Sequence, residues 1–217
     1  MIRDREEAGQ RLAAALSRYT DCPDGLILAV PRGGVVVGLE MSLSLRLPLD
    51  VLITRKIGAP DNPELAIGAL TETGYLHLNK DLLAAYPWLA RMVEQERALQ
   101  EREIVRRREL YRGGRNLPPL AGRTIILVDD GVATGATYLA SVQALKAGGV
   151  TRLVAALPVA PSDTAARIAA QVDECSMLES PEPFYAVGQH YLNFRQVEDE
   201  EVIRCLARAW HPPAQVL

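Results

Sequence analysis

The chain has 217 residues, of which 48% are hydrophobic and 24% are charged. It is therefore long enough for one domain, 1–217, with a substantial core, and its composition excludes disordered and fibrous classes. A net charge of −3 argues against a protein held on nucleic acid mainly by neutralising phosphates. No zinc-type or disulfide-type cysteine spacing, apolar leader or long apolar run is visible. We expect a cytoplasmic protein that binds neither nucleic acid nor a membrane.

Short apolar runs alternate with helical patterns along the chain, which is typical of a parallel sheet with connecting helices. The expected strands are Leu26–Val30, Leu49–Thr54, Thr124–Val128 and Arg152–Pro158, with weaker ones at Glu174–Leu178 and Phe184–Val187. The expected helices are Arg3–Tyr19, Val35–Leu47, Trp88–Arg112, Gly135–Ala147, Ser162–Gln171 and Asp199–Trp210. The first four strands lack polar alternation, as expected where helices cover both faces. The sequence predicts an α/β fold with a doubly wound parallel sheet.

A loop rich in Gly and Pro, Lys56–Pro63, interrupts this alternation after the second strand. It is followed by an apolar run, a Glu-Thr-Gly turn and a short run that ends at Leu78. This pattern predicts a hairpin or flap inserted between sheet strands, at about residues 57–79. We expect it to be the most mobile element.

The helix that follows the flap is rich in charge. Arg91–Arg112 carries seven Arg and five Glu. The interleaved glutamates favour a solvated helix or one that faces a second copy of the chain, rather than a nucleic-acid contact. A homodimer therefore stays open.

The strand at Thr124–Val128 runs into two acids, Asp129 and Asp130, and then into a loop of small residues that opens a helix. Small residues let the backbone approach a ligand closely, and the free N–H groups of a first helical turn attract an anion. The loop is therefore expected to hold a phosphate. Acids beside a phosphate suit vicinal sugar hydroxyls or Mg²⁺, and a phosphorylated ribose satisfies both. The alternative is that the two acids only cap the following helix.

This segment resembles the signature of the type I phosphoribosyltransferase family, which has four apolar residues, two acids and a small-residue loop ending in Thr-Gly-x-Thr. The resemblance covers most of the chain in order and spacing, and it implies that fold, with an inserted flap and a small C-terminal hood. It implies that Asp129 and Asp130 bind the ribose hydroxyls of 5-phosphoribosyl-1-pyrophosphate (PRPP), and that Mg²⁺ is the cofactor, held by these acids mainly through PRPP. The residues it assigns to the 5′-phosphate are Ala133, Thr134, Gly135, Ala136 and Thr137.

A second short loop, Arg32-Gly33-Gly34, follows the first strand. Two glycines between a strand and a helix let backbone amides face an anion, and Arg32 supplies a cation. The resemblance implies a pyrophosphate-binding loop here, often built with a non-proline cis peptide. The alternative is a simple turn from strand to helix.

Two cations, Arg55 and Lys56, end the second expected strand directly before the flap. A departing pyrophosphate gains negative charge and needs cations. In related transferases a basic residue here faces the pyrophosphate, and the adjacent loop closes to exclude water. We expect both residues, with Asp129 and Asp130, to be catalytic. Surface salt bridges are the alternative.

Four aromatic residues gather near the C-terminus, at Phe184, Tyr185, Tyr191 and Phe194. They predict a hood, at about residues 180–196, against which a planar acceptor stacks. The acceptor-binding candidates are Phe184, Tyr185 and Val187. The core of a small C-terminal subdomain is an equal alternative. His190, within this segment, is expected to be exposed.

The expected function is Mg²⁺-dependent transfer of a 5-phosphoribosyl group from PRPP to a nitrogenous acceptor, within nucleotide metabolism, with release of pyrophosphate. A regulator that senses PRPP without catalysis and a hydrolase acting on PRPP are the alternatives. Hypoxanthine and guanine phosphoribosyltransferases carry an aspartate at the place of Ala133, a lysine in the stretch corresponding to Leu157–Ala160, and an aspartate near the place of Leu192 and Asn193. These departures predict poor use of both 6-oxopurines and favour adenine or another base or amine.

Overall fold

The central sheet of the computed structural model, which describes residues 1–59 and 62–211, is fully parallel. Its strands run in the order β2-β1-β6-β7-β8, and every neighbouring pair is parallel. The strands are β1 (Gly25–Ala29), β2 (Leu49–Val51), β6 (Thr124–Val128), β7 (Arg152–Val159) and β8 (Glu174–Glu179). The carboxyl ends of β1 and β6 therefore lie side by side, where ligands bind in open α/β sheets.

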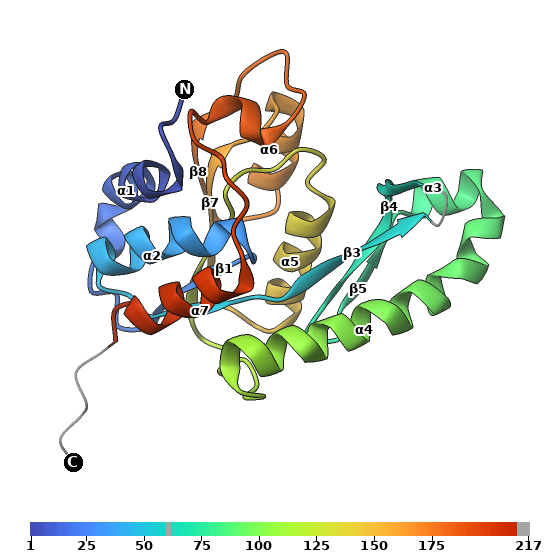
Figure 1. The fold of residues 1–217 in the computed structure, drawn as a ribbon, viewed down its shortest axis with the longest axis horizontal. Coiled ribbons are helices and arrows are strands. Elements are labelled where there is room, and N and C mark those ends of the chain that lie inside the picture. The colour runs from blue at the N-terminus through green and yellow to red at the C-terminus, as the bar shows by residue number, and fades with distance from the viewer. Residues whose placement is uncertain (60–61, 212–217) are drawn as a thin grey trace.

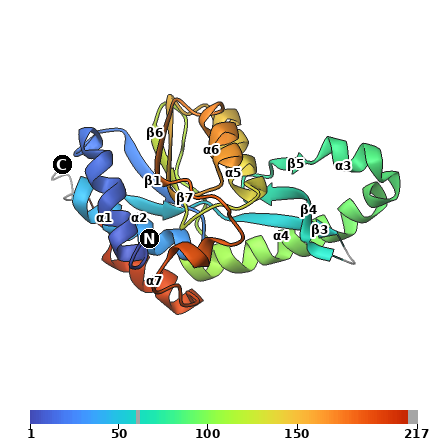
Figure 2. The same cartoon turned by 90° about the horizontal axis from the view of Figure 1, so that it is seen from above.

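Helices cover both faces of this sheet (Figures 1 and 2). One face carries α1 (Arg5–Ala15), α2 (Gly33–Leu45) and α7 (Asp199–Arg208), and the other carries α5 (Ala136–Ala147) and α6 (Ser162–Ala169). Neighbouring strand residues point to opposite faces, so Ile126 and Val128 join one apolar core while Ile125 and Leu127 join the other. The predicted doubly wound fold is confirmed.

The flap is a separate antiparallel sheet rather than a single hairpin. Its strands are β3 (Thr54–Ala59), β4 (Asn62–Thr71) and β5 (Leu76–Leu78), with β4 in the middle. Two helices follow, α3 (Lys80–Ala85) and the long α4 (Ala90–Arg112). Figure 1 shows this sheet extending away from the parallel sheet with α4 running along it. Ile57, Ile67 and Leu70 are buried in the same apolar cluster as Val93 and Ile104 of α4.

The second expected strand ends earlier than predicted, and this changes where Arg55 and Lys56 lie. Strand β2 ends at Val51, and Thr54 already pairs with Thr71 in the flap sheet. Glu72 holds the chain at the point where it leaves the parallel sheet. Its Oε1 accepts a hydrogen bond from Ile53 N (2.8 Å), and its own N–H donates to Ile53 O (2.9 Å). The flap therefore begins at Thr54 rather than near residue 57.

The weak strand expected at Phe184–Val187 is wrong. Residues Val187–His190 form a 3₁₀ turn, one of three with Ser17–Tyr19 and Pro87–Leu89 in the described chain. The extended pairing in this region belongs to Tyr191, which forms a parallel bridge with Ile2. None of the helices among residues 1–59 and 62–211 is long and apolar enough to cross a membrane.

Candidate functional site

The two acids lie where the chain leaves β6. The strand ends at Val128 and the chain bends at Asp130. The Asp130 N–H donates to Asp129 Oδ1 at 2.8 Å, which fixes one oxygen of Asp129. No further hydrogen bond to Asp129 is donated by the rest of the described chain.

The Arg32–Gly34 loop packs directly against these acids. A Cβ on Gly33 would lie 1.8 Å from Asp130 Oδ2, and one on Gly34 would lie 2.9 Å from Asp129 Cα. The peptide bond between Pro31 and Arg32 is cis, as the resemblance implied for this loop. The two motifs, about one hundred residues apart in sequence, thus form one surface at the carboxyl ends of β1 and β6.

Burial, and next the negative charge of Asp130, raise the pKa of the Asp129 carboxyl well above its usual range. Two neighbouring carboxylates repel each other, so the site favours a ligand that donates hydrogen bonds or carries positive charge. Vicinal hydroxyls and a divalent cation both meet this requirement.

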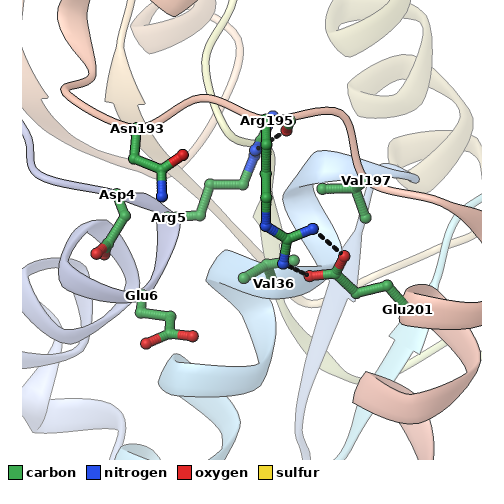
Figure 3. Close-up of a pocket in the computed structure, with 8 residues that line it drawn as sticks. All are labelled: Asp4, Arg5, Glu6, Val36, Asn193, Arg195, Val197 and Glu201. Carbon is green, nitrogen blue, oxygen red and sulfur yellow. Dashed lines mark hydrogen bonds and ion pairs between the residues drawn. The ribbon is translucent and has the colours of Figure 1, made fainter.

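Arg5, the first residue of α1, is a member of the site that the sequence reasoning missed. Its Nε and Nη2 each lie 2.7 Å from Asp130 Oδ2. Its Nη1 donates to Arg195 O at 2.8 Å, an approach visible in Figure 3. Arg5, Ala8, Gly9 and Leu12 form the buried face of α1, and their helical spacing is a signal that could have identified a buried arginine.

Arg195 itself belongs to a different contact. Its guanidinium forms a paired interaction with Glu201 of α7, at 2.6 and 2.7 Å (Figure 3). The small cavity between these groups, about 100 Å³, is lined by Asp4, Glu6 and Glu201 as well as by the arginines. Its mixed charge does not favour an anion.

The loop expected to hold a phosphate leads into α5, whose N-cap is Gly135 with φ +78°. The five backbone N–H groups from Ala133 to Thr137 donate to no acceptor in the described chain, and free N–H groups at the start of a helix suit an anion. Two side chains of α6 hold this loop through its carbonyl oxygens. Thr164 Oγ1 donates to Ala133 O (2.9 Å), and Arg167 Nη2 donates to Thr134 O (2.7 Å). The sequence reasoning did not identify these two supports.

The expected hood divides into two parts. Tyr191 is buried, its hydroxyl donates to Asp130 O at 2.6 Å, and its ring lies 5.0 Å from that of Phe194. Phe184 and Tyr185 instead line a cavity of about 860 Å³ together with Ala133 and other loop residues. One half of the segment is therefore structural, and the other half faces the loop that leads into α5.

Val187 and His190 complete this segment. Val187 packs against Gly131, where an added Cβ would lie 2.5 Å from Val187 Cγ1. His190 is half-buried rather than exposed as expected, because its ring stacks on Phe184 at 4.8 Å between centroids. Its Nε2 is buried without a hydrogen-bond partner in the described chain.

Arg55 and Lys56 lie on β3 and point to opposite faces of the flap sheet. Arg55 Nε donates to Gln100 Oε1 of α4 at 2.8 Å. Thr54 Oγ1 lies 2.8 Å from Ser141 Oγ of α5, so Lys56, two residues further along the regular strand, lies on the α5 face. Arg55 thus faces α4, away from that side.

Comparison with known proteins identifies relatives over almost the whole chain. The family model described as the phosphoribosyl transferase domain matches residues 2–194. A Mycobacterium tuberculosis H37Rv protein provisionally named as a phosphoribosyl transferase, Rv0571c, is 44% identical over 206 residues. These cover 95% of this chain and 46% of that protein, so the chain spans about half the length of this curated relative.

A solved structure with a similar fold is the TT1426 protein from Thermus thermophilus. It is 40% identical, the superposition covers 98% of this chain and 100% of that one, and the TM-score is 0.80. The flap sheet and long helix are included in this coverage.

Proposed function

The chain belongs to the phosphoribosyltransferase family, and from that premise we propose that it transfers a 5-phosphoribosyl group from PRPP to a nitrogenous acceptor with release of pyrophosphate. The observation that carries this proposal is the meeting of the acid pair, the Arg32–Gly34 loop and the row of free N–H groups at one sheet edge. PRPP has vicinal hydroxyls between a phosphate and a pyrophosphate, and these three features complement its three parts.

We assign the ribose hydroxyls to the acid pair. Asp129 and Asp130 each commit one oxygen to a partner within the protein, Asp129 Oδ1 to a backbone N–H and Asp130 Oδ2 to Arg5. The other oxygen of each accepts no hydrogen bond in the described chain. Two free acceptors on adjacent residues match two vicinal donors.

The same donor set suits Mg²⁺. Hard carboxylate oxygens are its preferred protein ligands, and it usually takes one or two of them together with substrate phosphates and water. Bound there, Mg²⁺ would neutralise negative charge on the departing pyrophosphate. Asp129 and Asp130 are the residues proposed to hold it, mainly through PRPP.

We assign the 5′-phosphate to Ala133, Thr134, Gly135, Ala136 and Thr137, and the pyrophosphate to Arg32, Gly33 and Gly34. The leaving group needs positive charge as its bond to C1 breaks. Lys56 is the flap cation that we propose to face it, because its strand position places it on the α5 side. The Arg55 side chain is held by Gln100, so we assign Arg55 to positioning the flap.

The acceptor is assigned to the cavity between the phosphate loop and the flap. Phe184 and Tyr185 offer aromatic surface on one side, and His77, Asn79 and Asp81 of the flap region line the other. Aromatic rings suit a planar base, which stacks on them. Val187, which packs against Gly131, is the third residue that we assign to the acceptor.

A pyrophosphate-release assay with PRPP and Mg²⁺ tests the proposal, using adenine, hypoxanthine, guanine and a reaction without acceptor as parallel arms. We expect release that depends on an acceptor, and weak release with the two 6-oxopurines, because Ala133 cannot accept a proton. Release without acceptor would identify a hydrolase. Tight PRPP binding with no release across a broad panel of bases and amines would identify a sensor. Turnover of a 6-oxopurine at ordinary enzyme rates, about 10 per second, would refute the role given to Ala133.

A further inference from the structure

Arg5 is buried and fully engaged, which is unusual for an arginine. It is 8% exposed, and its guanidinium carbon lies 3.9 Å above the centre of the Phe194 ring. All three guanidinium nitrogens have acceptors, two on Asp130 Oδ2 and one on Arg195 O. A buried charge of this kind persists only where its partners compensate for the lost hydration.

Arg5 contacts only one of the two carboxylate oxygens of Asp130. Both Arg5 nitrogens lie 2.7 Å from the same oxygen, Oδ2 of Asp130, instead of forming the two-oxygen fork common for arginine and carboxylate pairs. Oδ1 accepts no hydrogen bond from Arg5. The arrangement fixes the direction of the carboxylate without using its second oxygen.

The Arg5 and Asp130 side chains pack directly against the Arg32–Gly34 loop. A Cβ on Gly33 would lie 1.8 Å from Asp130 Oδ2 and 2.9 Å from Arg5 Nε. Asp130 is thus confined between α1 on one side and the Arg32–Gly34 loop on the other. Its main chain is held as well, because the Tyr191 hydroxyl donates to its carbonyl oxygen.

We infer that Arg5 is a positioning residue of the donor site, which holds Asp130 through Oδ2 so that Oδ1 receives a hydroxyl of the sugar phosphate. This inference rests on the proposed function, and it adds a residue of the N-terminal helix to the site. Arg5 acts through Asp130 and does not contact the ligand, since its nitrogens are already engaged.

A double-mutant cycle on ligand affinity tests this inference, measured by titration calorimetry with Mg²⁺ and two probes, PRPP and inorganic pyrophosphate. The variants are Arg5→Gln, Asp130→Asn and the two combined. Arg11→Gln is the matched control, because Arg11 lies on the same helix and pairs with Glu7 and Glu179 at the surface.

We expect Arg5→Gln to weaken PRPP binding by about tenfold or more, the size of one lost charge-assisted hydrogen bond. In the Asp130→Asn background the same change should cost less than about threefold, because the carboxylate on which Arg5 acts is gone. Pyrophosphate affinity should stay within about threefold of wild type in Arg5→Gln, and Arg11→Gln should bind both probes as wild type does.

Two results would overturn the inference. An equal loss of PRPP affinity with and without Asp130, or an equal loss for pyrophosphate, would show that Arg5 acts directly on phosphate charge. If Arg5→Gln fails to fold, Arg5→Lys keeps the charge, but its single ammonium cannot reach both Asp130 and Arg195 O. Partial loss of PRPP affinity in that variant supports positioning, and full wild-type affinity refutes it. Wild-type protein that does not bind PRPP would refute the proposed function itself, whereas wild-type binding with unaffected variants refutes the role of Arg5 alone.

Discussion

Exchanging each acid of the pair for its amide should change stability in opposite directions while weakening PRPP binding in both cases. The two positions differ in their surroundings. Burial and the charge of Asp130 raise the pKa of Asp129, so the ionised form of Asp129 is unfavourable in the folded state. Asp130, in contrast, is the charge partner of the buried Arg5.

For Asp129→Asn we expect the free energy of unfolding to rise at pH 7.5, because the amide replaces a buried carboxyl whose ionised form is disfavoured by burial and by the charge of Asp130. The sign follows from proton binding. A carboxyl with a raised pKa in the folded state makes stability fall as pH rises above the pKa of the unfolded chain, until the folded pKa is passed. Asp129→Asn should remove that part of the decline.

For Asp130→Asn we expect a loss of about 1–3 kcal/mol, the cost of leaving a buried charged donor with a weaker acceptor. The amide still accepts one hydrogen bond, so the loss should be smaller than for complete removal of a buried partner. PRPP affinity should fall about tenfold or more in both variants, because each loses one carboxyl oxygen that we assign to a ribose hydroxyl.

Urea unfolding at several pH values, together with calorimetric titration of PRPP, measures both effects. Stability changes of the same sign in Asp129→Asn and Asp130→Asn would refute the electrostatic reasoning. Unchanged PRPP affinity in both would show that the acids serve only as caps for the following helix.

Three further predictions concern ligand binding, the flap and its anchor. PRPP with Mg²⁺ at about one hundred times its dissociation constant should add about 2.7 kcal/mol of stability, and a thermal scan without any shift at millimolar PRPP would remove the donor assignment. Gly58–Leu78 should exchange amide hydrogens more slowly with PRPP bound, although Ile57 and Ile67 already bury the flap against α4; unchanged exchange would indicate a fixed structural sheet. Arg112→Ala should destabilise the protein by about 3–5 kcal/mol, because it leaves Glu72 buried without its ion pair; a loss below about 1 kcal/mol in urea unfolding would contradict this.

The central sheet and the signature loops could be predicted because local pattern determines them. Strand β6 has the predicted bounds, Thr124–Val128, since all five of its residues are buried and four of them are apolar, as expected for a strand covered on both faces. The acid pair follows β6 directly in sequence, so a correct prediction of this strand also placed the two acids at the edge of the sheet. Proximity to the Arg32–Gly34 loop followed from parallel neighbouring strands.

The remainder depends on contacts between distant segments. The sequence predicts one strand over Leu49–Thr54, whereas the contact of Ile53 with Glu72, which pairs with Arg112 of α4, marks the point where the chain passes from β2 to the flap sheet. His190 became half-buried through a ring at the other end of the hood segment. Arg5 gains its partner 125 residues away. The helical spacing of α1 could indicate that Arg5 is buried, but it does not identify Asp130 as the partner.

Arg32, which we assign to the pyrophosphate, already has two carboxylate partners within the protein. Arg32 Nη1 lies 3.3 Å from Glu198 and 3.9 Å from Asp199, at the start of α7. An incoming pyrophosphate must compete with these carboxylates for Arg32. Asp199 also accepts a hydrogen bond from the hydroxyl of Tyr111, so Glu198 is the partner that can be altered with least disturbance.

Glu198→Gln should therefore tighten PRPP binding by about two- to fivefold, because a partly exposed ion pair is worth at most about 1 kcal/mol. Glu200→Gln is the matched control. This substitution removes the same charge from an exposed position two residues further along the chain, in α7. Titration of both variants at two salt concentrations separates the effects. An equal gain of PRPP affinity in both variants, lost at high salt, would show only that the negative charge at the start of α7 repels the ligand in general. A weaker affinity in Glu198→Gln would show that Glu198 orients Arg32 for the ligand instead of competing with it.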